Sequence, residues 1–191
     1  MIEQDSHNEH EGETTGVLSP AALLVEHVGL FSEMPVDRPV LDLACGQGHN
    51  GIFLAAKGIQ VILADRSEEA LEKARALADQ QGVTGRFWRV DLETEGFNPF
   101  EQDAYAGIVV FRYLHRPLIP CIKKALARGG LLIYETYTVD QPRFGRPHNP
   151  AFLLKPGELR GWFSEWTLLH YFEGILQDPP RAVAQIVCRK P

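Results

Sequence analysis

The fold of this chain is decided by Val40-Leu41-Asp42-Leu43-Ala44-Cys45-Gly46-Gln47-Gly48-His49-Asn50. An apolar run that contains one acid is followed by a turn with two glycines. The apolar part predicts a buried parallel strand over residues 40–43, and the apolar residues 52–56 predict a helix that packs back onto it. Glycine has no Cβ and adopts positive φ without strain, so Gly46 and Gly48 admit a ligand close to the backbone. The stretch therefore predicts a strand, turn and helix that hold a cofactor.

Two kinds of cofactor use such a turn. Gly46, Gly48 and Gly51 satisfy G-x-G-x-x-G, the dinucleotide-binding pattern, and Asp65 has the spacing of its ribose-binding acid. Short glycine patterns are frequent by chance, however, and Asp42 would repel an anionic pyrophosphate. The same carboxylate attracts a cofactor that carries an ammonium and a sulfonium group, namely S-adenosylmethionine. We therefore interpret the turn as an S-adenosylmethionine site, with a nicotinamide-dependent oxidoreductase as the alternative.

Strand-like and helix-like segments alternate along the chain, which predicts a parallel sheet with helices on both faces. The expected strands are residues 40–43, 59–64, 85–90, 106–111 and 131–136. Four helices are expected, and they begin at the N-cap Ser19, at Gly51, at the N-cap Ser67 and before Ile119. In the third helix, Glu69 and Lys73 are spaced to form an ion pair. The fourth helix is expected to run through Ile122 and Leu126 and to stop at Arg128-Gly129-Gly130.

Two further strands, residues 166–174 and 182–189, follow without a helix between them, so we expect them to pair antiparallel. The predicted fold class is therefore α/β, a Rossmann-like doubly wound sheet that is mostly parallel and ends in an antiparallel C-terminal hairpin. Residues 138–157, rich in proline and basic residues, predict an ordered loop or lid.

Length and composition fit one globular domain. The chain has 191 residues, 45% of them hydrophobic, and a formal net charge of −6, which disfavours extended nucleic-acid binding. Residues 1–16 are polar and acidic and are expected to form a disordered tail, with residues 17–191 as a single domain. A nicotinamide dehydrogenase usually has a second, substrate-binding domain, for which little chain remains.

Cysteine usage and hydropathy indicate neither a metal site nor a membrane segment. Cys45, Cys121 and Cys188 are scattered and form no C-x-x-C, so neither a zinc site nor a disulfide framework is expected, and Cys45 is expected to be a packed side chain. No apolar run is long enough to cross a bilayer, and no basic segment precedes an apolar one at the N-terminus. We therefore expect a cytoplasmic protein without a metal; its oligomeric state is not predicted.

With these elements placed, the chain resembles class I S-adenosylmethionine-dependent methyltransferases and, within that group, is similar to the tellurite-resistance methyltransferase family. The resemblance covers roughly residues 38–189. It is carried by Leu41-Asp42-Leu43-Ala44-Cys45-Gly46-Gln47-Gly48-His49-Asn50 with Leu54-Ala55-Ala56-Lys57-Gly58, and by Pro156-Gly157-Glu158-Leu159-Arg160 leading to Trp166. The chain departs from the pattern at Ala44, at His49 and over residues 138–155, where acceptor specificity would lie.

The resemblance implies which residues bind the cofactor. Asp65 would accept hydrogen bonds from both ribose hydroxyls, and Asp91 one from the adenine amino group, beside the backbone of Leu92. These acids follow strands, at the edge where open α/β sheets bind ligands. The predicted cofactor-binding residues are Asp42, Ala44, Gly46, Gly48, Asn50, Asp65, Arg66, Asp91, Leu92 and Phe111.

The segment after the fourth strand is expected to face the reactive methyl group. Arg112 and Tyr113 would orient the acceptor, and His115 would act as a general base or, alternatively, only bond within a turn. Glu135 and Tyr137 are expected at the same mouth.

Positive charge at this mouth would attract an anion. The residues expected to supply it are Arg112, Arg116, Arg143, Arg146 and His148. The sequence thus predicts a methyltransferase for a small polar or anionic acceptor. An RNA or protein methyltransferase and a non-catalytic S-adenosylmethionine-binding module are the alternatives.

Overall fold

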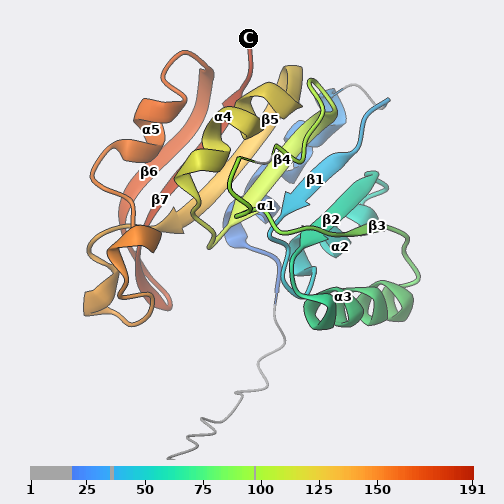
Figure 1. Cartoon of the computed structure of the whole chain (residues 1–191), viewed down its shortest axis with the longest axis horizontal. Helices are drawn as coiled ribbons and strands as arrows, with labels where there is room; N and C mark the ends of the chain where they lie inside the picture. Colours follow the sequence, from blue (N-terminus) through green and yellow to red (C-terminus); the bar gives the residue numbers. More distant parts are fainter. Residues whose placement is uncertain (1–18, 35–36, 97) are drawn as a thin grey trace, which may run out of the picture.

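The computed structural model describes residues 19–34, 37–96 and 98–191, so the tail predicted for residues 1–16 lies outside the described residues. In the described part, one seven-stranded sheet has the order β3-β2-β1-β4-β5-β7-β6 (Figure 1). Strands β1 to β5 pair in parallel, whereas β7 is antiparallel to both β5 and β6. This sheet confirms the predicted fold class, including the antiparallel C-terminal hairpin.

The strands are β1 (Val40–Leu43), β2 (Val61–Asp65), β3 (Arg86–Arg89), β4 (Tyr105–Phe111), β5 (Leu126–Tyr137), β6 (Thr167–Gln177) and β7 (Pro180–Arg189). The α-helices are α1 (Ala22–His27), α2 (His49–Ala56), α3 (Glu68–Gln81), α4 (Ile119–Ala125) and α5 (Glu158–Trp162). Short 3₁₀ turns lie at Val28–Glu33, Arg116–Leu118, Gln141–Arg143 and Pro150–Phe152.

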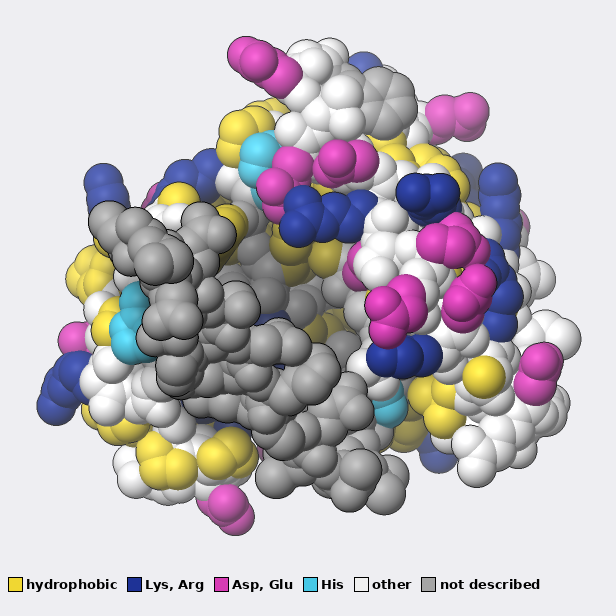
Figure 2. All heavy atoms as spheres, turned by 60° about the horizontal axis from the view of Figure 1, so that its bottom comes forward, with side chains coloured by type: hydrophobic (Ala, Val, Ile, Leu, Met, Phe, Trp, Pro, Cys, Tyr) yellow, Lys and Arg dark blue, Asp and Glu magenta, His cyan; other side chains and the backbone are white. Residues whose placement is uncertain are grey.

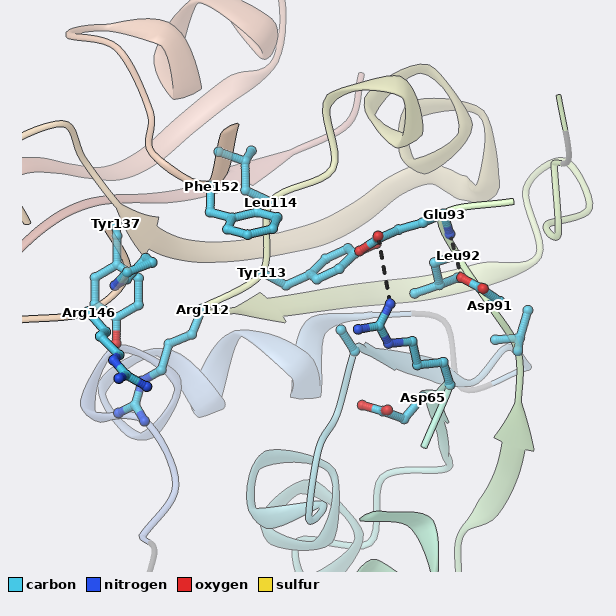
Figure 3. Close-up of a pocket in the computed structure, with 14 residues that line it drawn as sticks. Asp65, Asp91, Leu92, Glu93, Arg112, Tyr113, Leu114, Tyr137, Arg146 and Phe152 are labelled. Atoms are coloured by element: carbon cyan, nitrogen blue, oxygen red, sulfur yellow. Dashed lines mark hydrogen bonds and ion pairs between the residues drawn. The ribbon is translucent and has the colours of Figure 1, made fainter. Parts of the chain in front are cut away.

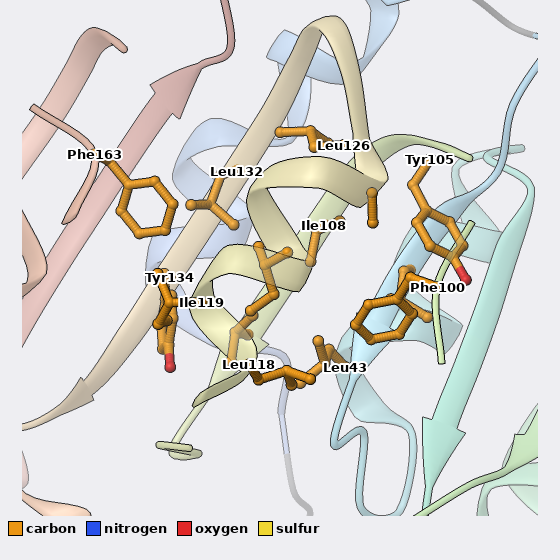
Figure 4. Packing of buried hydrophobic residues seen from close by; sticks show 14 of the residues in the cluster. Leu43, Phe100, Tyr105, Ile108, Leu118, Ile119, Leu126, Leu132, Tyr134 and Phe163 are labelled. Carbon is orange, nitrogen blue, oxygen red and sulfur yellow. The ribbon is translucent and has the colours of Figure 1, made fainter. Parts of the chain in front are cut away.

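Each face of the sheet carries its own apolar core. On one face, Ile119 of α4 and Phe163, just after α5, pack with Leu132 of β5 (Figure 4). On the other face, Leu24 of α1 and Ile52 of α2 belong to a second buried cluster. Fully burying a side chain of this size contributes roughly 1.5–3 kcal/mol, so both cores hold the helices firmly on the sheet.

The start of α3 follows the sequence pattern closely. Ser67 is the N-cap, and its side-chain oxygen accepts a hydrogen bond from the Ala70 N–H at 3.2 Å. Glu69 and Lys73 form the expected ion pair at 2.9 Å. Both predictions are confirmed, and because α3 follows β2 directly, the cap also fixes the chain just after Asp65.

Two predicted helix boundaries are wrong, and α2 begins at His49, two residues before the predicted Gly51. The first helix begins at Ala22 with Ala21 as its N-cap, not Ser19, because the Ala21 N–H donates to the side chain of Asn50 in α2 at 2.9 Å. The helix α4 ends at Ala125, and Leu126 already pairs with Tyr105 in the sheet. Leu126 is fully buried in the sheet, and because an apolar residue at helical spacing can equally belong to a buried strand, the spacing alone gave the wrong end.

Candidate functional site

The candidate site lies at the carboxyl edge of the parallel strands. A cavity of about 440 Å³ opens there between the ends of β2, β3, β4 and β5 and the segment after β5 (Figure 3). It is lined by Ala44, Asp65, Arg66, Val90, Asp91, Leu92, Glu93, Arg112, Tyr113, Leu114, Tyr137, Arg146, Pro147 and Phe152. A second cavity, of about 300 Å³, surrounds the glycine turn and shares Ala44 and Arg112 with the first. The two adjoin, so one extended ligand can occupy both.

The face that contains this edge carries charges of both signs. Figure 2 shows acidic and basic side chains interspersed around a hollow, with apolar side chains deeper inside it. Among the described side chains visible in this view, neither sign forms a continuous stripe. Such a surface differs from the clustered Lys and Arg with which proteins bind nucleic-acid phosphates.

The two glycines of the turn serve different purposes. Both have positive φ, +53° at Gly46 and +81° at Gly48. Among the described residues, a Cβ added at Gly46 would meet nothing within 4 Å, whereas one at Gly48 would lie 2.7 Å from the Cβ of Ala74 in α3. Gly46 therefore leaves room for a ligand, as predicted, but Gly48 is needed for the packing of α3 against the turn.

Asp42 lies beneath the turn and is only 1% exposed. Its Oδ2 accepts a hydrogen bond from the Gly51 N–H at 2.7 Å. Burial raises the pKa of Asp42 to about 7, and the nearby charge of Asp65 adds to the rise while the Gly51 hydrogen bond opposes it. A cation bound beside this carboxyl favours the ionised form. A Cβ at Gly51 would lie 2.9 Å from the same Oδ2, which gives the third glycine a reason unrelated to a pyrophosphate.

Asp65 is fixed by the backbone at the end of β2. Its Oδ2 accepts from the Gly46 N–H at 2.8 Å and its Oδ1 from the Ser67 N–H at 2.9 Å. Each carboxylate oxygen has a second lone pair, so hydroxyl donors from a ligand still find acceptors here.

Asp91 is fixed in the same manner at the end of β3. Its Oδ1 accepts from the Glu93 N–H at 3.0 Å. Arg66 also lines the cavity, with its Nη1 3.8 Å from Glu93 Oε2. Leu92 is buried and lines the same end. Sequence reasoning missed Glu93 and Val90, which only the course of the chain after β3 places here.

Cys45 and Asn50, near the turn, are held by protein contacts. Burial raises the pKa of Cys45 above its usual value, and Asp42 and Asp65 raise it further, so the thiol remains protonated. The prediction that Cys45 is a packed side chain agrees with its contacts to the core. Asn50 lines the smaller cavity with Phe111, although its Oδ1 already accepts from the Ala21 N–H.

Arg112 and Tyr113 follow β4, as expected, and line the larger cavity. Arg112 has a φ of +57°, and its N–H donates to the Glu135 carbonyl at 2.9 Å. The Tyr113 hydroxyl is buried and has no hydrogen-bond partner among the described residues. Burial raises its pKa, with contributions from Glu93 and Asp91, so it remains a donor. In Figure 3 its ring points toward Glu93, at the end where Asp91 lies, rather than toward Tyr137.

Two residues expected at the mouth are not there. His115 is not among the residues that line either cavity. Glu135 is buried, and its Oε2 accepts a hydrogen bond from Gln185 Nε2 of β7 at 2.6 Å. Side chains alternate along a strand, so Glu135 shares the face of Ile133, which packs in the core containing α1. The expectation for Glu135 is wrong.

Arg116 holds the lid instead of offering its charge to a ligand. Its Nε and Nη2 donate to the two carboxylate oxygens of Glu158 at 2.7 and 2.8 Å. Its Nη1 and Nη2 also donate to the carbonyls of Ala151 and Leu153, at 2.9 and 2.8 Å. The expectation that Arg116 attracts an anion is therefore wrong; it ties the segment around Phe152 to the chain after β4.

The lid contributes one of its three expected basic residues to the cavity. Arg146 lines it, whereas Arg143 lies 4.0 Å from Asp140, and neither Arg143 nor His148 is a lining residue. Phe152 and Pro147, which sequence reasoning missed, complete the wall. Within the described ranges, no group of acids, cysteines and histidines is placed to hold a metal ion, and no helix is long and apolar enough to cross a membrane.

Comparison with known proteins agrees with this geometry. Residues 40–130 match the family described as a methyltransferase domain. The crystal structure of TehB from Haemophilus influenzae superposes with a TM-score of 0.68 and 22% identity, over 87% of this chain and 62% of that one. Residues 40–130 thus carry a methyltransferase domain, and the sheet has the fold of class I S-adenosylmethionine-dependent methyltransferases. The resemblance found in the sequence is thereby confirmed, and S-adenosylmethionine is the cofactor of this domain.

Three relatives in sequence are instructive. Hemagglutinin 1 of Eikenella corrodens is 32% identical over 142 residues, 71% of this chain and 46% of that protein. The probable S-adenosylmethionine-dependent methyltransferase TehB of H. influenzae is 27% identical, over 71% of this chain and 48% of its own length. The tRNA 5-carboxymethoxyuridine methyltransferase of Escherichia coli K12 is 36% identical over 63% of this chain and 49% of that protein. The chain thus spans about half the length of the relatives it matches.

Proposed function

We propose that this protein transfers the methyl group of S-adenosylmethionine to a small polar or anionic acceptor. The observation that carries the proposal is the larger cavity at the sheet edge, of about 440 Å³, which has acids at one end and, at the other, arginines without a carboxylate partner among the described residues. Cofactor and acceptor would share this space.

The residues present fit the cofactor. Asp65 and Asp91 offer carboxylate oxygens where ribose and adenine donors would lie, and the orphaned Tyr113 hydroxyl offers a buried donor beside them. Gly46 leaves open space at the turn, and Asp42 lines the smaller cavity, where a cationic methionine moiety would bind. A neutral ligand there would leave the buried Asp42 carboxyl without a counter-charge.

When bound, S-adenosylmethionine supplies an already activated methyl group, so the protein mainly has to align the acceptor. Arg112 lines both cavities and is the residue best placed to face acceptor and cofactor together. Tyr113, with its hydroxyl at the acidic end, would hold the cofactor rather than the acceptor. His115, outside the lining, is assigned no part in this proposal.

The size of the acceptor is limited by the lid. Arg116 bonds Glu158 and two lid carbonyls, which fixes the wall that contains Phe152. An RNA acceptor is the second candidate, favoured by the tRNA methyltransferase among the relatives. The mixed charges around the hollow favour the small acceptor instead.

The proposal is tested by titration calorimetry with S-adenosylmethionine, S-adenosylhomocysteine and NADH. We expect the first two ligands to bind and NADH not to bind. Transfer of a labelled methyl group is then measured on small organic acids, thiols, oxyanions, total tRNA and peptides. Labelling of tRNA with no turnover of any small molecule would replace the small acceptor by RNA, and labelling of none would favour a binding module.

A further inference from the structure

Two arginines at one end of the larger cavity lack a carboxylate partner. Arg112 and Arg146 both line it, and neither guanidinium is within ion-pair or hydrogen-bond distance of an acid in the described part of the chain. The other arginines near the cavity differ, since Arg66 faces Glu93 and Arg116 is bonded to Glu158. Figure 3 shows Arg112 and Arg146 beside Tyr137, at the opposite end from Asp91.

The backbones that carry these arginines are anchored. The Arg112 N–H donates to the Glu135 carbonyl, and its φ of +57° is a conformation that a non-glycine residue rarely adopts without such support. The Arg146 carbonyl accepts from Gln141 Nε2 at 3.0 Å, and the buried Gln141 in turn accepts from the Ala182 N–H of β7 at 2.9 Å. Both arginines that line the cavity are therefore carried by backbone that is held in place.

The wall around them is apolar. Leu114, Pro147 and Phe152 line the same cavity, together with Tyr137. Phe152 is 45% exposed, one of the most exposed large hydrophobic residues described. An exposed aromatic ring at a cavity wall, next to a few placed polar groups, is typical of a site for a partly apolar small molecule.

We propose that the acceptor is a small organic acid with one anionic group on an apolar body. The anionic group, a carboxylate in the simplest case, binds Arg112 and Arg146, and the body packs on Phe152 and Pro147. Arginine presents paired N–H donors that match a carboxylate, and such charge-assisted bonds are the strong ones. A bare inorganic oxyanion leaves the apolar wall uncovered, and a neutral molecule leaves the charges unmatched. This inference rests on the proposed function and narrows its acceptor class.

The test uses the full chain saturated with S-adenosylhomocysteine. Calorimetry then measures the affinity for benzoate, cyclohexanecarboxylate, benzamide and inorganic phosphate. We expect both carboxylates to bind at least about tenfold more tightly than benzamide and than phosphate. Equal affinities for benzoate and benzamide would overturn the inference, as would phosphate that binds as tightly as benzoate.

Two variants locate the contacts. Arg146→Gln should weaken benzoate binding about tenfold and leave benzamide and S-adenosylhomocysteine unchanged. Phe152→Ala should weaken cyclohexanecarboxylate more than phosphate. The matched control is Arg143→Gln, in the same lid but outside the lining, with its guanidinium near Asp140; it should change neither affinity. Equal effects of the Arg143 and Arg146 substitutions would also overturn the inference.

The outcomes separate the two proposals. Failure of S-adenosylhomocysteine to bind overturns both the proposed function and this inference. Binding of S-adenosylhomocysteine without a preference for carboxylates overturns the inference alone.

Discussion

The two ends of the cavity are built in different ways. At the cofactor end, Asp65 ends β2 and Asp91 lies just after the neighbouring β3; Asp65 accepts two backbone hydrogen bonds and Asp91 accepts one. At the acceptor end, Arg112 follows β4, whereas Arg146 and Phe152 come from the lid, which long-range contacts such as Arg116 with Glu158 join to the chain after β4. One end offers acceptors to the hydroxyl and amino donors of a nucleoside, and the other offers donors to an anion. One edge of the sheet thus presents hydrogen-bond acceptors at one end of the cavity and cationic donors at the other.

The largest expected effect is at the glycine turn of the cofactor end. Gly48→Ala should lower the free energy of unfolding by about 2–5 kcal/mol, because the left-handed conformation is strained for alanine and the new methyl group meets Ala74. Denaturant unfolding measures this loss. In Gly46→Ala the new methyl group contacts no described residue, so only the strain of the left-handed conformation should lower the free energy of unfolding, by about 1–2 kcal/mol. Equal losses in the two variants would mean that Gly48 is not a packing position.

Asp65→Ala tests the same end through binding. The substitution removes the acceptors for the ribose hydroxyls and should weaken S-adenosylhomocysteine binding by about 1–3 kcal/mol. Calorimetry measures the affinity, and circular dichroism checks the fold, since the Gly46 and Ser67 N–H groups also lose their partner. Glu72→Ala, an exposed acid of α3, is the control. Unchanged affinity in a folded Asp65→Ala protein would remove Asp65 from the site.

Asp42 predicts a pH dependence at this end. Its pKa in the folded protein, about 7, lies above the ordinary value of 3.8, so the native state binds more protons than the unfolded state between these values. Its contribution to stability therefore falls as pH rises through that window. Binding of the S-adenosylmethionine cation needs the carboxylate, so affinity should rise up to about tenfold per pH unit below 7 and then level off. Calorimetry between about pH 5 and pH 8 measures this. If the affinity of Asp42→Asn depended on pH equally steeply, the pH dependence would belong to another titratable group.

Tyr113 and His115 sharpen the boundary between the two ends. Tyr113→Phe removes a buried hydroxyl that has no partner in the described residues, so it should leave stability unchanged or raised. It should weaken S-adenosylhomocysteine binding by about 0.5–1.5 kcal/mol if the hydroxyl bonds the nucleoside. Calorimetry and thermal unfolding measure the two effects. His115→Ala, which alters no lining residue, should change neither. A loss of cofactor affinity in His115→Ala alone would reverse this assignment.

The sequence by itself determined the parts whose structure depends on neighbours along the chain. The run at Val40–Leu43, the glycines that follow it and the Ser67 cap act through backbone conformation and local hydrogen bonds, and all lie where the pattern placed them. Asp65 and Asp91 could be placed because parallel strands bring their carboxyl ends to one edge. The pairing of β6 and β7 followed from the missing helix between them.

Tertiary structure decided the rest, because a side chain's role there depends on partners distant in sequence. Arg116 and Arg146 have the same charge and lie in similarly polar segments. Arg116 nevertheless forms an ion pair with Glu158, whereas Arg146 lines the cavity. The end of α4 at Ala125 depends on the pairing of Leu126 with β4. Phe152 lines the cavity because Arg116 donates hydrogen bonds to the carbonyls on either side of it, which holds the lid beside the strands. A local pattern fixes which groups are present, and long-range contacts fix which of them remain free to bind a ligand.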